Sequence, residues 1–442
     1  MGMTRIGKVM AVALAGAMLC SAAPQRGVPP AGEGLIALKA ARLFDATSER
    51  MRDDAVVLVR DGRIVGVGAS ADIPAGTQVI DLGDATLLPG FIDAHSHLTL
   101  ESDADYYRHV FKQMMRTQSE QAFYAGANAR VTLEAGFTTV RHVGARYFID
   151  IGLRNAINAG LTPGPRILAS GNPITARGGS CDQPPFPAER VAPKTAIDGV
   201  CSGGAECREA VRHQMNNGAD AIKICVSGGV LSWDPVDVPQ LTREEITAAV
   251  EEAHNWGRKV AAHAHGDTAA RIAIEAGVDS IEHGSFLSEA TLKLMKARGV
   301  FLVPTCTAID WVETHSGNYP PNIAEKAITA SKAHHDMLRM AIRIGVPIAA
   351  GTDMSVVDKG HGKNAIEMVL LTRYGMRPAA ALIAGTREAA RLLGVADRVG
   401  TIETGKDADI VVVAGNPVAD IAVTQKPVLV MQRGRIVMRK TS

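Results

Sequence analysis

Short apolar runs that end in a polar residue recur along the middle of the chain, and helical stretches separate most of them. Such runs are predicted to be strands at 87–97, 138–142, 166–170, 221–226, 259–263, 280–283, 300–304 and 347–353. Apolar residues recur at helical spacing between several of them, at 243–256, 268–277, 289–298 and 322–344. Most of these helical stretches end at a glycine, which is typical of a helix C-cap. The alternation of strands and helices predicts an α/β fold, a (β/α)8 barrel of the TIM type.

The two ends of the chain have a different pattern, in which short strands follow one another without helices. These strands are expected at 36–40, 55–60, 63–68, 409–414, 427–432 and 435–439. The dipeptides Asp61-Gly62 and Arg433-Gly434 separate neighbouring strands and indicate hairpin turns. We therefore expect residues 35–86 and 398–442 to form one small flanking β-sandwich, beside a barrel of residues 87–397.

The first 22 residues have the pattern of a secretory signal peptide. Basic residues precede an apolar run at 9–19, which is too short for a stable membrane anchor, and small residues follow it. Cys20 makes a lipoprotein the alternative, but the bulky Leu19 before it disfavours lipid attachment. We expect a periplasmic or secreted protein with no stable membrane span.

Charge and composition limit the classes of partner. The chain has 47 Lys and Arg against 46 Asp and Glu, a net charge of +1, and only 4% aromatic residues. No basic tract is present, so the sequence argues against nucleic-acid binding. We expect a small-molecule or dipeptide substrate and a homo-oligomer.

The cysteines matter because an exported protein can form disulfides. Cys181, Cys201 and Cys207 fall in one long loop between the third and fourth predicted strands, and we expect one bridge among them. The sequence leaves open which two of the three pair. Cys225 and Cys306 lie on or beside predicted strands and are expected to be buried free thiols.

Candidate chemistry begins at the end of the first predicted strand, where His95 and His97 are separated by one residue. Side chains at i and i+2 project from the same side of an extended chain, so two neutral imidazoles can bind one divalent metal such as zinc. Further ionisable residues lie at or near the ends of other predicted strands: Lys223, His263, His283 and Asp353. Because the carboxyl ends of barrel strands meet at one face, we expect these residues to converge on a metal centre.

These residues and their neighbours resemble the amidohydrolase superfamily. The resemblance rests on His-Ser-His after the first strand, Lys223 on the fourth, His263 in His-Ala-His-Gly, His283 in Glu-His-Gly and Asp353 in Gly-Thr-Asp. It covers nearly the whole mature chain. The runs Ser-Gly-Gly-Val at 227–230 and His-Gly-Lys-Asn at 361–364 are similar to one branch of this superfamily. That branch contains imidazolonepropionase-like proteins, bacterial prolidases that cleave Xaa-Pro dipeptides, and ochratoxin-hydrolysing amidohydrolases.

The resemblance implies a binuclear zinc centre bridged by carbamylated Lys223. A lysine ammonium cannot bind a metal, whereas its carbamate is a carboxylate that can bridge two cations. The expected ligands are His95, His97 and Asp353 for the first zinc, and His263 and His283 for the second. Two cations lower the pKa of a bound water and polarise the scissile carbonyl. Asp353 is then expected to accept the proton of the water and pass it to the leaving amine.

Other polar residues are expected to contact the substrate. The family spacing favours His263 over His265 as the strand ligand, so that His265 faces the substrate carbonyl or carboxylate as a catalytic group. The expected substrate-binding residues are His142, His265, His361 and Arg146. The alternatives are that His142 packs under the site, that His361 makes a structural hydrogen bond, and that the arginines, Arg141 included, pair with carboxylates of the barrel.

Three functions compete at this stage. The first is a binuclear metallohydrolase that cleaves the amide bond to a C-terminal amino acid, in Xaa-Pro-type dipeptides, N-acyl amino acids or ochratoxin A. The second is a mononuclear deaminase or a cyclic-amide hydrolase of the imidazolonepropionase type. Lys223 argues against the deaminases, which need no bridging carboxylate, but not against the cyclic-amide hydrolases. The third is an inactive scaffold, which the complete set of candidate ligands disfavours.

Overall fold

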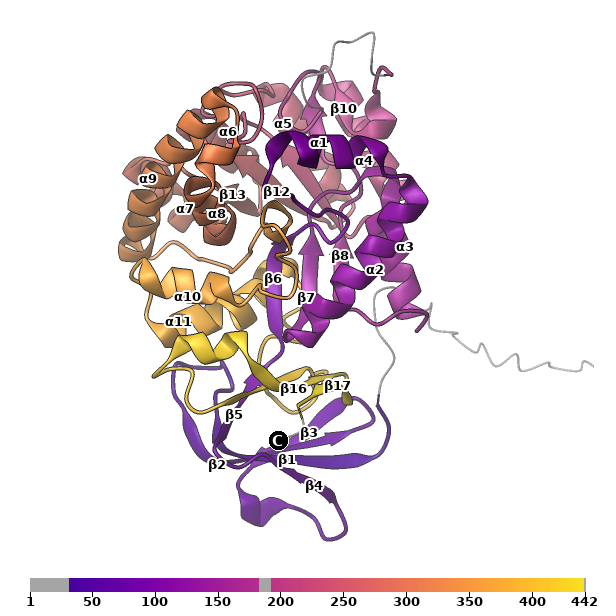
Figure 1. Cartoon of the computed structure of the whole chain (residues 1–442), viewed down its shortest axis with the longest axis vertical. Helices are drawn as coiled ribbons and strands as arrows, with labels where there is room; N and C mark the ends of the chain where they lie inside the picture. The colour runs from indigo at the N-terminus through magenta and orange to yellow at the C-terminus, as the bar shows by residue number, and fades with distance from the viewer. Residues whose placement is uncertain (1–31, 183–191, 441–442) are drawn as a thin grey trace, which may run out of the picture.

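The computed structural model describes residues 32–182 and 192–440, so the predicted signal peptide at 1–22 lies outside the described residues (Figure 1). Within these ranges no helix is long and apolar enough to cross a membrane.

Strands from the two ends of the chain pair in one sheet. They are β1 (Leu35–Leu43), β2 (Arg52–Arg60), β3 (Arg63–Gly68), β4 (Gln78–Asp81), β5 (Ala85–Pro89), β15 (Ile410–Ala414), β16 (Pro427–Gln432) and β17 (Arg435–Arg439). Their order is β17–β16–β15–β5–β1–β2–β3, and β4 also pairs with β1. The antiparallel pairing of β15 with β5 joins the two ends, whose indigo and yellow ribbons lie side by side in Figure 1.

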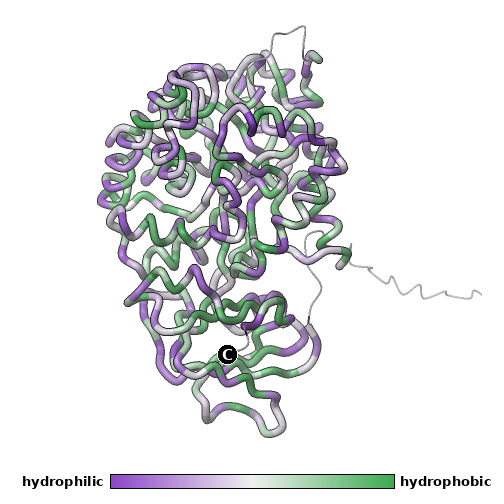
Figure 2. The backbone as a smooth tube through the Cα atoms, viewed as in Figure 1, coloured by the Kyte–Doolittle hydropathy of each residue, from purple (hydrophilic) through white to green (hydrophobic). Residues whose placement is uncertain are grey.

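The predicted hairpin turns of this sheet are present. Asp61 and Gly62 have φ of 49° and 80°, and Arg433 and Gly434 have φ of 45° and 75°. Two successive residues with positive φ form the turn whose twist matches antiparallel strands. The alternate residues of these strands form one buried apolar cluster, which includes Leu38, Val57, Leu87, Val412 and Leu429. Hydrophobic stretches of this part of the backbone appear in green in Figure 2.

Parallel strands form the middle of the chain. One sheet contains β6 (Phe91–Ser96), β7 (Phe137–His142) and β8 (Arg166–Ala169). A second contains β9 (Ile174–Ala176), β10 (Val200–Cys201), β11 (Ala221–Cys225), β12 (Lys259–Ala264), β13 (Ser280–His283) and β14 (Phe301–Val303), in the order β10–β9–β11–β12–β13–β14. The second to seventh predicted strands are therefore confirmed, and no end is shifted by more than one residue.

Two of the predicted strands need correction. The run 87–97 is divided at Gly90 into β5, which belongs to the terminal sheet, and β6, which belongs to the parallel strands. The run 347–353 forms only one isolated parallel bridge, between Leu302 and Ile348. Pro347 has no N–H to donate to a ladder, and Asp353 has φ of 48°, so regular pairing ends at both of its limits.

The run 347–353 nevertheless lies between β14 and β6. Ala349 N–H donates to the carbonyl of Leu302, and Ala94 N–H donates to the carbonyl of Ala350. A Cβ added at Gly351 would come within 2.5 Å of Val303 and 2.8 Å of the His95 nitrogen, so only glycine permits this close approach. The fold is thus a mixed α/β fold with parallel strands, but the ladders of the described strands do not join into one closed sheet.

Helices lie outside the parallel strands, as Figure 1 shows. They are α1 (Tyr106–Met115), α2 (Gln118–Glu134), α3 (Ile149–Asn158), α4 (Gly204–Asn216), α5 (Arg243–Asn255), α6 (Asp267–Ala276), α7 (Glu289–Arg298), α8 (Cys306–Thr314), α9 (Pro321–Ile344), α10 (Ile366–Arg373), α11 (Pro378–Ile383) and α12 (Ala389–Leu393). The four helices predicted from spacing agree with α5, α6, α7 and α9 to within a residue at each end. α5 begins at a capping box of Thr242 and Glu245, and its buried face includes Ile246 and Ala249.

The disulfides confirm one prediction and correct another. Cys201 pairs with Cys207, which is the expected bridge within the long loop. Cys181 pairs with Cys225, so the prediction of a free thiol at Cys225 is wrong. The start of the loop folds back over the end of β11, where the Ser180 hydroxyl donates to the carbonyl of Ser227, and this brings the two Cα atoms to 6.2 Å. Cys306 is free and buried, as predicted.

Candidate metal centre

Two groups of potential ligands meet at the carboxyl ends of the parallel strands. His95, His97 and Asp353 form one group, and His263, His265 and His283 form the other. Within each group the ligand atoms all lie within 4.8 Å of one another. The ring centroids of His95 and His283 are 5.0 Å apart, so the two groups are adjacent. The structure therefore brings together histidines from β6, β12 and β13.

Hydrogen bonds fix the tautomers of His95 and His97. The Nδ1 of His95 lies 2.6 Å from Oε2 of Glu282, and the Nδ1 of His97 lies 3.0 Å from the carbonyl oxygen of Gly144. A carbonyl and an ionised carboxylate can only accept, so each Nδ1 carries the proton. Both Nε2 atoms keep a lone pair that can bind a metal, the arrangement found in carboxylate–histidine–zinc sites.

The second group is oriented in the same way. The Nδ1 of His283 donates to the hydroxyl of Thr305 over 2.7 Å, because that hydroxyl itself donates to the carbonyl of Pro304. The Nε2 of His263 donates to the carbonyl of Gly228 over 3.2 Å, which leaves its Nδ1 unprotonated. The Nδ1 of His265 lies 2.9 Å from the hydroxyl of Ser285, which can donate or accept.

Burial keeps these imidazoles neutral. Desolvation is the main cause that lowers the pKa of His95 and His283 well below the usual value, and the neighbouring Lys223 lowers both further. The same two causes lower the pKa of His263 to about 3. A neutral imidazole is the form that binds a metal, so the site is prepared for metal binding at neutral pH.

Lys223 lies on β11, 3% exposed, among these histidines. None of the ion pairs formed by the described residues includes it, although Glu282 and Asp353 are near enough to influence it. Burial lowers the pKa of Lys223 to about 8, against the opposing effect of these two carboxylates. Part of the amine is therefore unprotonated near neutral pH, which is the form that reacts as a nucleophile.

The backbone is strained at three of these positions. His283, Thr305 and Asp353 have φ of 71°, 53° and 48°, in the left-handed region that non-glycine residues seldom adopt. The Asp353 N–H donates to the carbonyl of His95 over 2.8 Å, and the Ser355 hydroxyl donates to Oδ1 of Asp353 over 3.0 Å. Strain of this kind persists where surrounding contacts hold it, and it concentrates at functional sites.

The sequence reasoning missed two buried carboxylates under the site. Glu282 accepts hydrogen bonds from His95 and, over 2.8 Å, from the Arg141 guanidinium. Asp93 accepts from the backbone of His95 and Thr352 and from Asn364. The available signal was a carboxylate within two residues of a candidate histidine ligand on a short strand. Arg141 pairs with Glu282, so the alternative in which an arginine pairs with a barrel carboxylate is correct for this residue.

Two of the predicted substrate-binding residues, His142 and His361, lie near His97. The Nε2 of His142 accepts from the backbone of Thr99, and its ring centroid lies 5.7 Å from that of His97. The Nε2 of His361 donates to the carbonyl of Leu100 over 2.8 Å. The Nδ1 atoms of His142 and His361 are buried without a hydrogen-bond partner in the part of the chain that the structure describes.

Arg146 is held by the long loop. Its guanidinium donates to the carbonyls of Cys181, Asp182 and Asp198, over 2.7, 2.8 and 3.3 Å. Desolvation lowers the pKa of Arg146. Its observed contacts orient the loop, and contact with a substrate stays a prediction.

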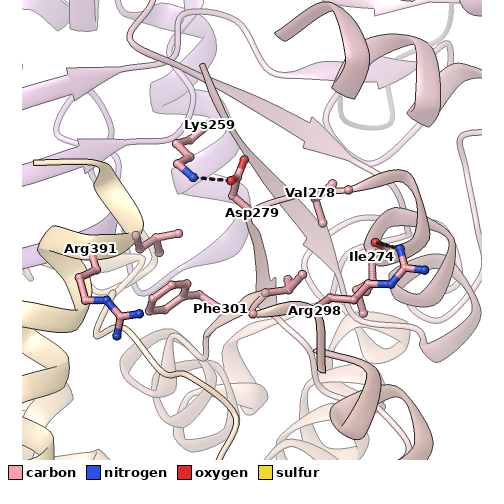
Figure 3. A pocket seen from close by; sticks show the side chains of 11 residues that line it. Lys259, Ile274, Val278, Asp279, Arg298, Phe301 and Arg391 are labelled. Atoms are coloured by element: carbon pink, nitrogen blue, oxygen red, sulfur yellow. Dashed lines mark hydrogen bonds and ion pairs between the residues drawn. The ribbon is translucent and has the colours of Figure 1, made fainter. Parts of the chain in front are cut away.

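A cavity of about 340 Å³ lies at the opposite ends of β12–β14 (Figure 3). It is lined by Lys259, Asp279, Arg298, Phe301 and Arg391, among others. Lys259 pairs with Asp279 over 2.7 Å, Arg298 donates to the carbonyls of Ile274 and Glu275, and Arg391 pairs with Glu388. These cations are thus neutralised or satisfied by the protein itself.

Oriented neutral histidines, a buried lysine and an aspartate at the ends of parallel strands define a hydrolase with a candidate metal centre. The chain belongs to the amidohydrolase family, which it matches over residues 86–437, and it is a hydrolase acting on amide bonds. The resemblance seen in the sequence is thereby confirmed.

Relatives of this chain include enzymes of several substrate classes. It is 31% identical over 405 residues to ochratoxinase of Aspergillus niger, covering 87% of this chain and 82% of that one. A crystal structure of a Xaa-Pro dipeptidase with bound methionine in the active site is 36% identical, with a TM-score of 0.87, covering 91% of this chain and 99% of that chain. Imidazolonepropionase of Mesorhizobium japonicum is 26% identical, covering 80% of this chain and 85% of that one.

Proposed function

We propose that this protein is an exported binuclear zinc amidohydrolase that hydrolyses the amide bond to a C-terminal amino acid. The proposal includes a closed (β/α)8 barrel of residues 87–397 and a β-sandwich of residues 35–86 and 398–442. The observation that carries it is the set of neutral imidazoles around the buried amine of Lys223, which forms no ion pair with any described residue. Each imidazole is held by a hydrogen bond to one ring nitrogen.

The side chains fit a pair of zinc ions. His95, His97 and Asp353 would hold one ion, His263 and His283 would hold the other, and carbamylated Lys223 would bridge them. When bound, zinc supplies a water of lowered pKa and polarises the scissile carbonyl. Zinc prefers nitrogen and carboxylate ligands of this kind, and carbonyl or carboxylate partners on the remote ring nitrogens support such ligands.

Asp353 is proposed as the residue that moves the proton. Its carboxylate oxygen Oδ1 is 3.7 Å from Nε2 of His97 and is oriented by the Ser355 hydroxyl. It would accept the proton of the attacking water and deliver it to the leaving amine nitrogen. His265 keeps its Nε2 for the substrate carbonyl or carboxylate, because its Nδ1 is engaged by Ser285.

The substrate class is inferred from the buried polar groups next to the site. His142 could bind the carboxylate of the leaving amino acid through its Nδ1–H, which lies 3.8 Å from Oδ2 of Asp150, with Arg146 beside the long loop. The Nε2 of His361 carries the ring proton, so its Nδ1 would accept a hydrogen bond from a substrate N–H or hydroxyl. Xaa-Pro-type dipeptides, N-acyl amino acids and ochratoxin A all carry such a carboxylate. The similarity to a Xaa-Pro dipeptidase and to ochratoxinase supports this class.

Amidating the substrate carboxylate tests the substrate class. We expect kcat/KM to fall at least about a hundredfold, since a buried partner of a charged group would be left unsatisfied. The matched control is a substrate of the same length with a free acid. An amide cleaved as fast as the acid would contradict this class and favour the alternative, a cyclic-amide hydrolase of the imidazolonepropionase type, which the likeness to that enzyme supports.

Metal analysis and Lys223→Ala test the zinc centre. We expect about two zinc ions per chain, and the variant should lose most activity because nothing would bridge the ions. Short carboxylic acids added with zinc should restore part of it. Full activity of the variant without added acid would contradict the role of Lys223.

Export is proposed from the predicted signal peptide, and the disulfides are consistent with an oxidising compartment. Amino-terminal sequencing of protein from the periplasm or medium should find cleavage near residue 22. Retention of uncleaved protein in the cytoplasm would contradict export.

A further inference from the structure

The helix α1 presents an apolar face to solvent. Tyr107, Phe111, Met114 and Met115 are exposed by 67, 62, 59 and 66%. Their spacing of i, i+4, i+7 and i+8 puts them on one side of the helix, along nearly its whole length. A surface helix usually turns such a face inward, so α1 has the pattern of a helix that packs against a partner.

The other contacts of α1 show which side faces its own chain. Tyr106 is buried and its ring lies 6.1 Å from that of Tyr319, in the segment between α8 and α9. Arg108 and Lys112 both pair with Asp103, just before the helix. The cations that flank the apolar face are therefore already paired within the chain.

This pairing decides between two kinds of partner. A helix that lies on a membrane carries unpaired cations beside its apolar face, and these attract anionic lipid. The two cations of α1 share Asp103 instead. The exposed residues are tyrosine, phenylalanine and methionine, which are the apolar types enriched at the centre of protein–protein interfaces.

We propose that α1 is the contact between two copies of this chain, related by a two-fold axis near Phe111. A two-fold contact uses the same patch on both copies, so the residue at the middle of the helix meets its own counterpart. Phe111 is at the middle of α1, whose bounds are Tyr106–Met115.

The available area agrees with this arrangement. An aromatic side chain can bury roughly 150–250 Å², and methionine is of similar size. With about two-thirds of each side chain exposed, the four residues offer on the order of 500 Å² per copy. Phe123 on α2 is 82% exposed and adjoins Tyr124, over which Arg116 at the end of α1 stacks at 3.8 Å. Two copies would bury about 1,000 Å² or more, near the lower limit of specific interfaces, which predicts a dimer that dilution can dissociate.

Phe111→Asp tests the contact by sedimentation velocity over a range of protein concentrations. The wild type should be dimeric at micromolar concentration, or a larger assembly built from such pairs. The variant should dissociate at concentrations at least tenfold higher, because two carboxylates would be buried together. The matched control is Leu161→Asp, since Leu161 is 81% exposed and lies after α3. A monomeric wild type, or association that Phe111→Asp leaves unchanged, would overturn the proposal.

A cross-link tests the two-fold arrangement. Phe111→Cys should be joined to a second copy by a short bis-maleimide, and Leu161→Cys should not. Among residues 32–182 and 192–440 the other free cysteine is Cys306, which is buried. Equal cross-linking of both variants would overturn the arrangement. Binding of a monomeric wild type to phosphatidylglycerol vesicles, lost in Phe111→Asp, would also overturn it in favour of a lipid surface. Neither measurement depends on zinc or on the substrate.

Discussion

Asp279, just before β13, and His283, at the end of β13, lie four residues apart and have opposite surroundings. At the amino end, Asp279 accepts from Lys259, His254 and the backbone of Val260, so its carboxylate is satisfied by the protein. At the carboxyl end, His283 has one nitrogen held by Thr305 and the other left with a lone pair, on a backbone with positive φ. The contacts of Asp279 therefore stabilise the fold, whereas His283 has a strained backbone and a ring nitrogen that is available to bind a metal.

The largest expected effect distinguishes these two ends directly. His283→Asn should reduce kcat at least about a thousandfold, more than the 10–100-fold cost of losing an outer partner of a metal site, because a metal ligand itself is lost. Its melting temperature should fall little or rise. Zinc content and kcat would be measured together, with Asp279→Asn as the matched variant. A kcat within tenfold of wild type would end the assignment of His283 as a ligand.

Asp353→Asn should come next, with a loss of about 10²–10⁴-fold in kcat at unchanged fold, the range that a general acid–base group supplies. Ser355→Ala is the control, since it removes only the donor to Oδ1. Its effect should be much smaller. A loss below tenfold in the asparagine variant would exclude Asp353 as the proton carrier.

Glu282→Gln should weaken zinc binding by about 10–100-fold, because the carboxylate that orients His95 becomes a neutral amide. Competition with a chromophoric chelator measures the affinity. The effect tests whether Glu282, inside β13, supports the metal ligands at the carboxyl ends of the strands. Unchanged zinc affinity would mean that Glu282 serves only to pair with Arg141.

Acid should destabilise the histidine-bearing end. His334 is buried and donates to the carbonyl of Pro304, just after β14, and burial lowers its pKa to about 4. Between pH 6.5 and 4 the unfolded chain binds more protons at this group, so stability is full above pH 6.5 and falls as the pH falls. At pH 5 this one histidine should lower the free energy of unfolding by about 2 kcal/mol relative to neutral pH. Urea unfolding of the metal-free proteins at pH 7.5 and 5 measures how much of the free energy of unfolding is lost in acid. This loss should be smaller in His334→Gln than in wild type, and equal losses would refute the prediction.

The smallest effect is expected at the amino end. Asp279→Asn should lower the free energy of unfolding by about 1–2 kcal/mol, since partly exposed ion pairs contribute modestly and one backbone hydrogen bond weakens. kcat should stay within twofold of wild type. Denaturant unfolding and steady-state kinetics of the same preparation measure both. A large fall in kcat with an unchanged free energy of unfolding would show that Asp279 contributes to catalysis and not to stability.

The sequence by itself determined the alternation of strands and helices and the positions of the candidate ligands. Period-two and helical spacing are local properties, so the bounds of β13 and α7 could be read from the chain. Because parallel strands share one carboxyl edge, His95, His263 and Asp353 could be expected to converge before their distances were known.

Tertiary structure alone decided the pairing and orientation of these groups. The Cys181–Cys225 bridge depends on a loop that folds back over β11, and no local pattern encodes that path. The proton on each imidazole is set by an acceptor far away in sequence, as Glu282 is for His95. The run 347–353 reads as a strand, but Pro347 and the close approach at Gly351 leave it with a single bridge, because sheet pairing is a property of two segments and not of one.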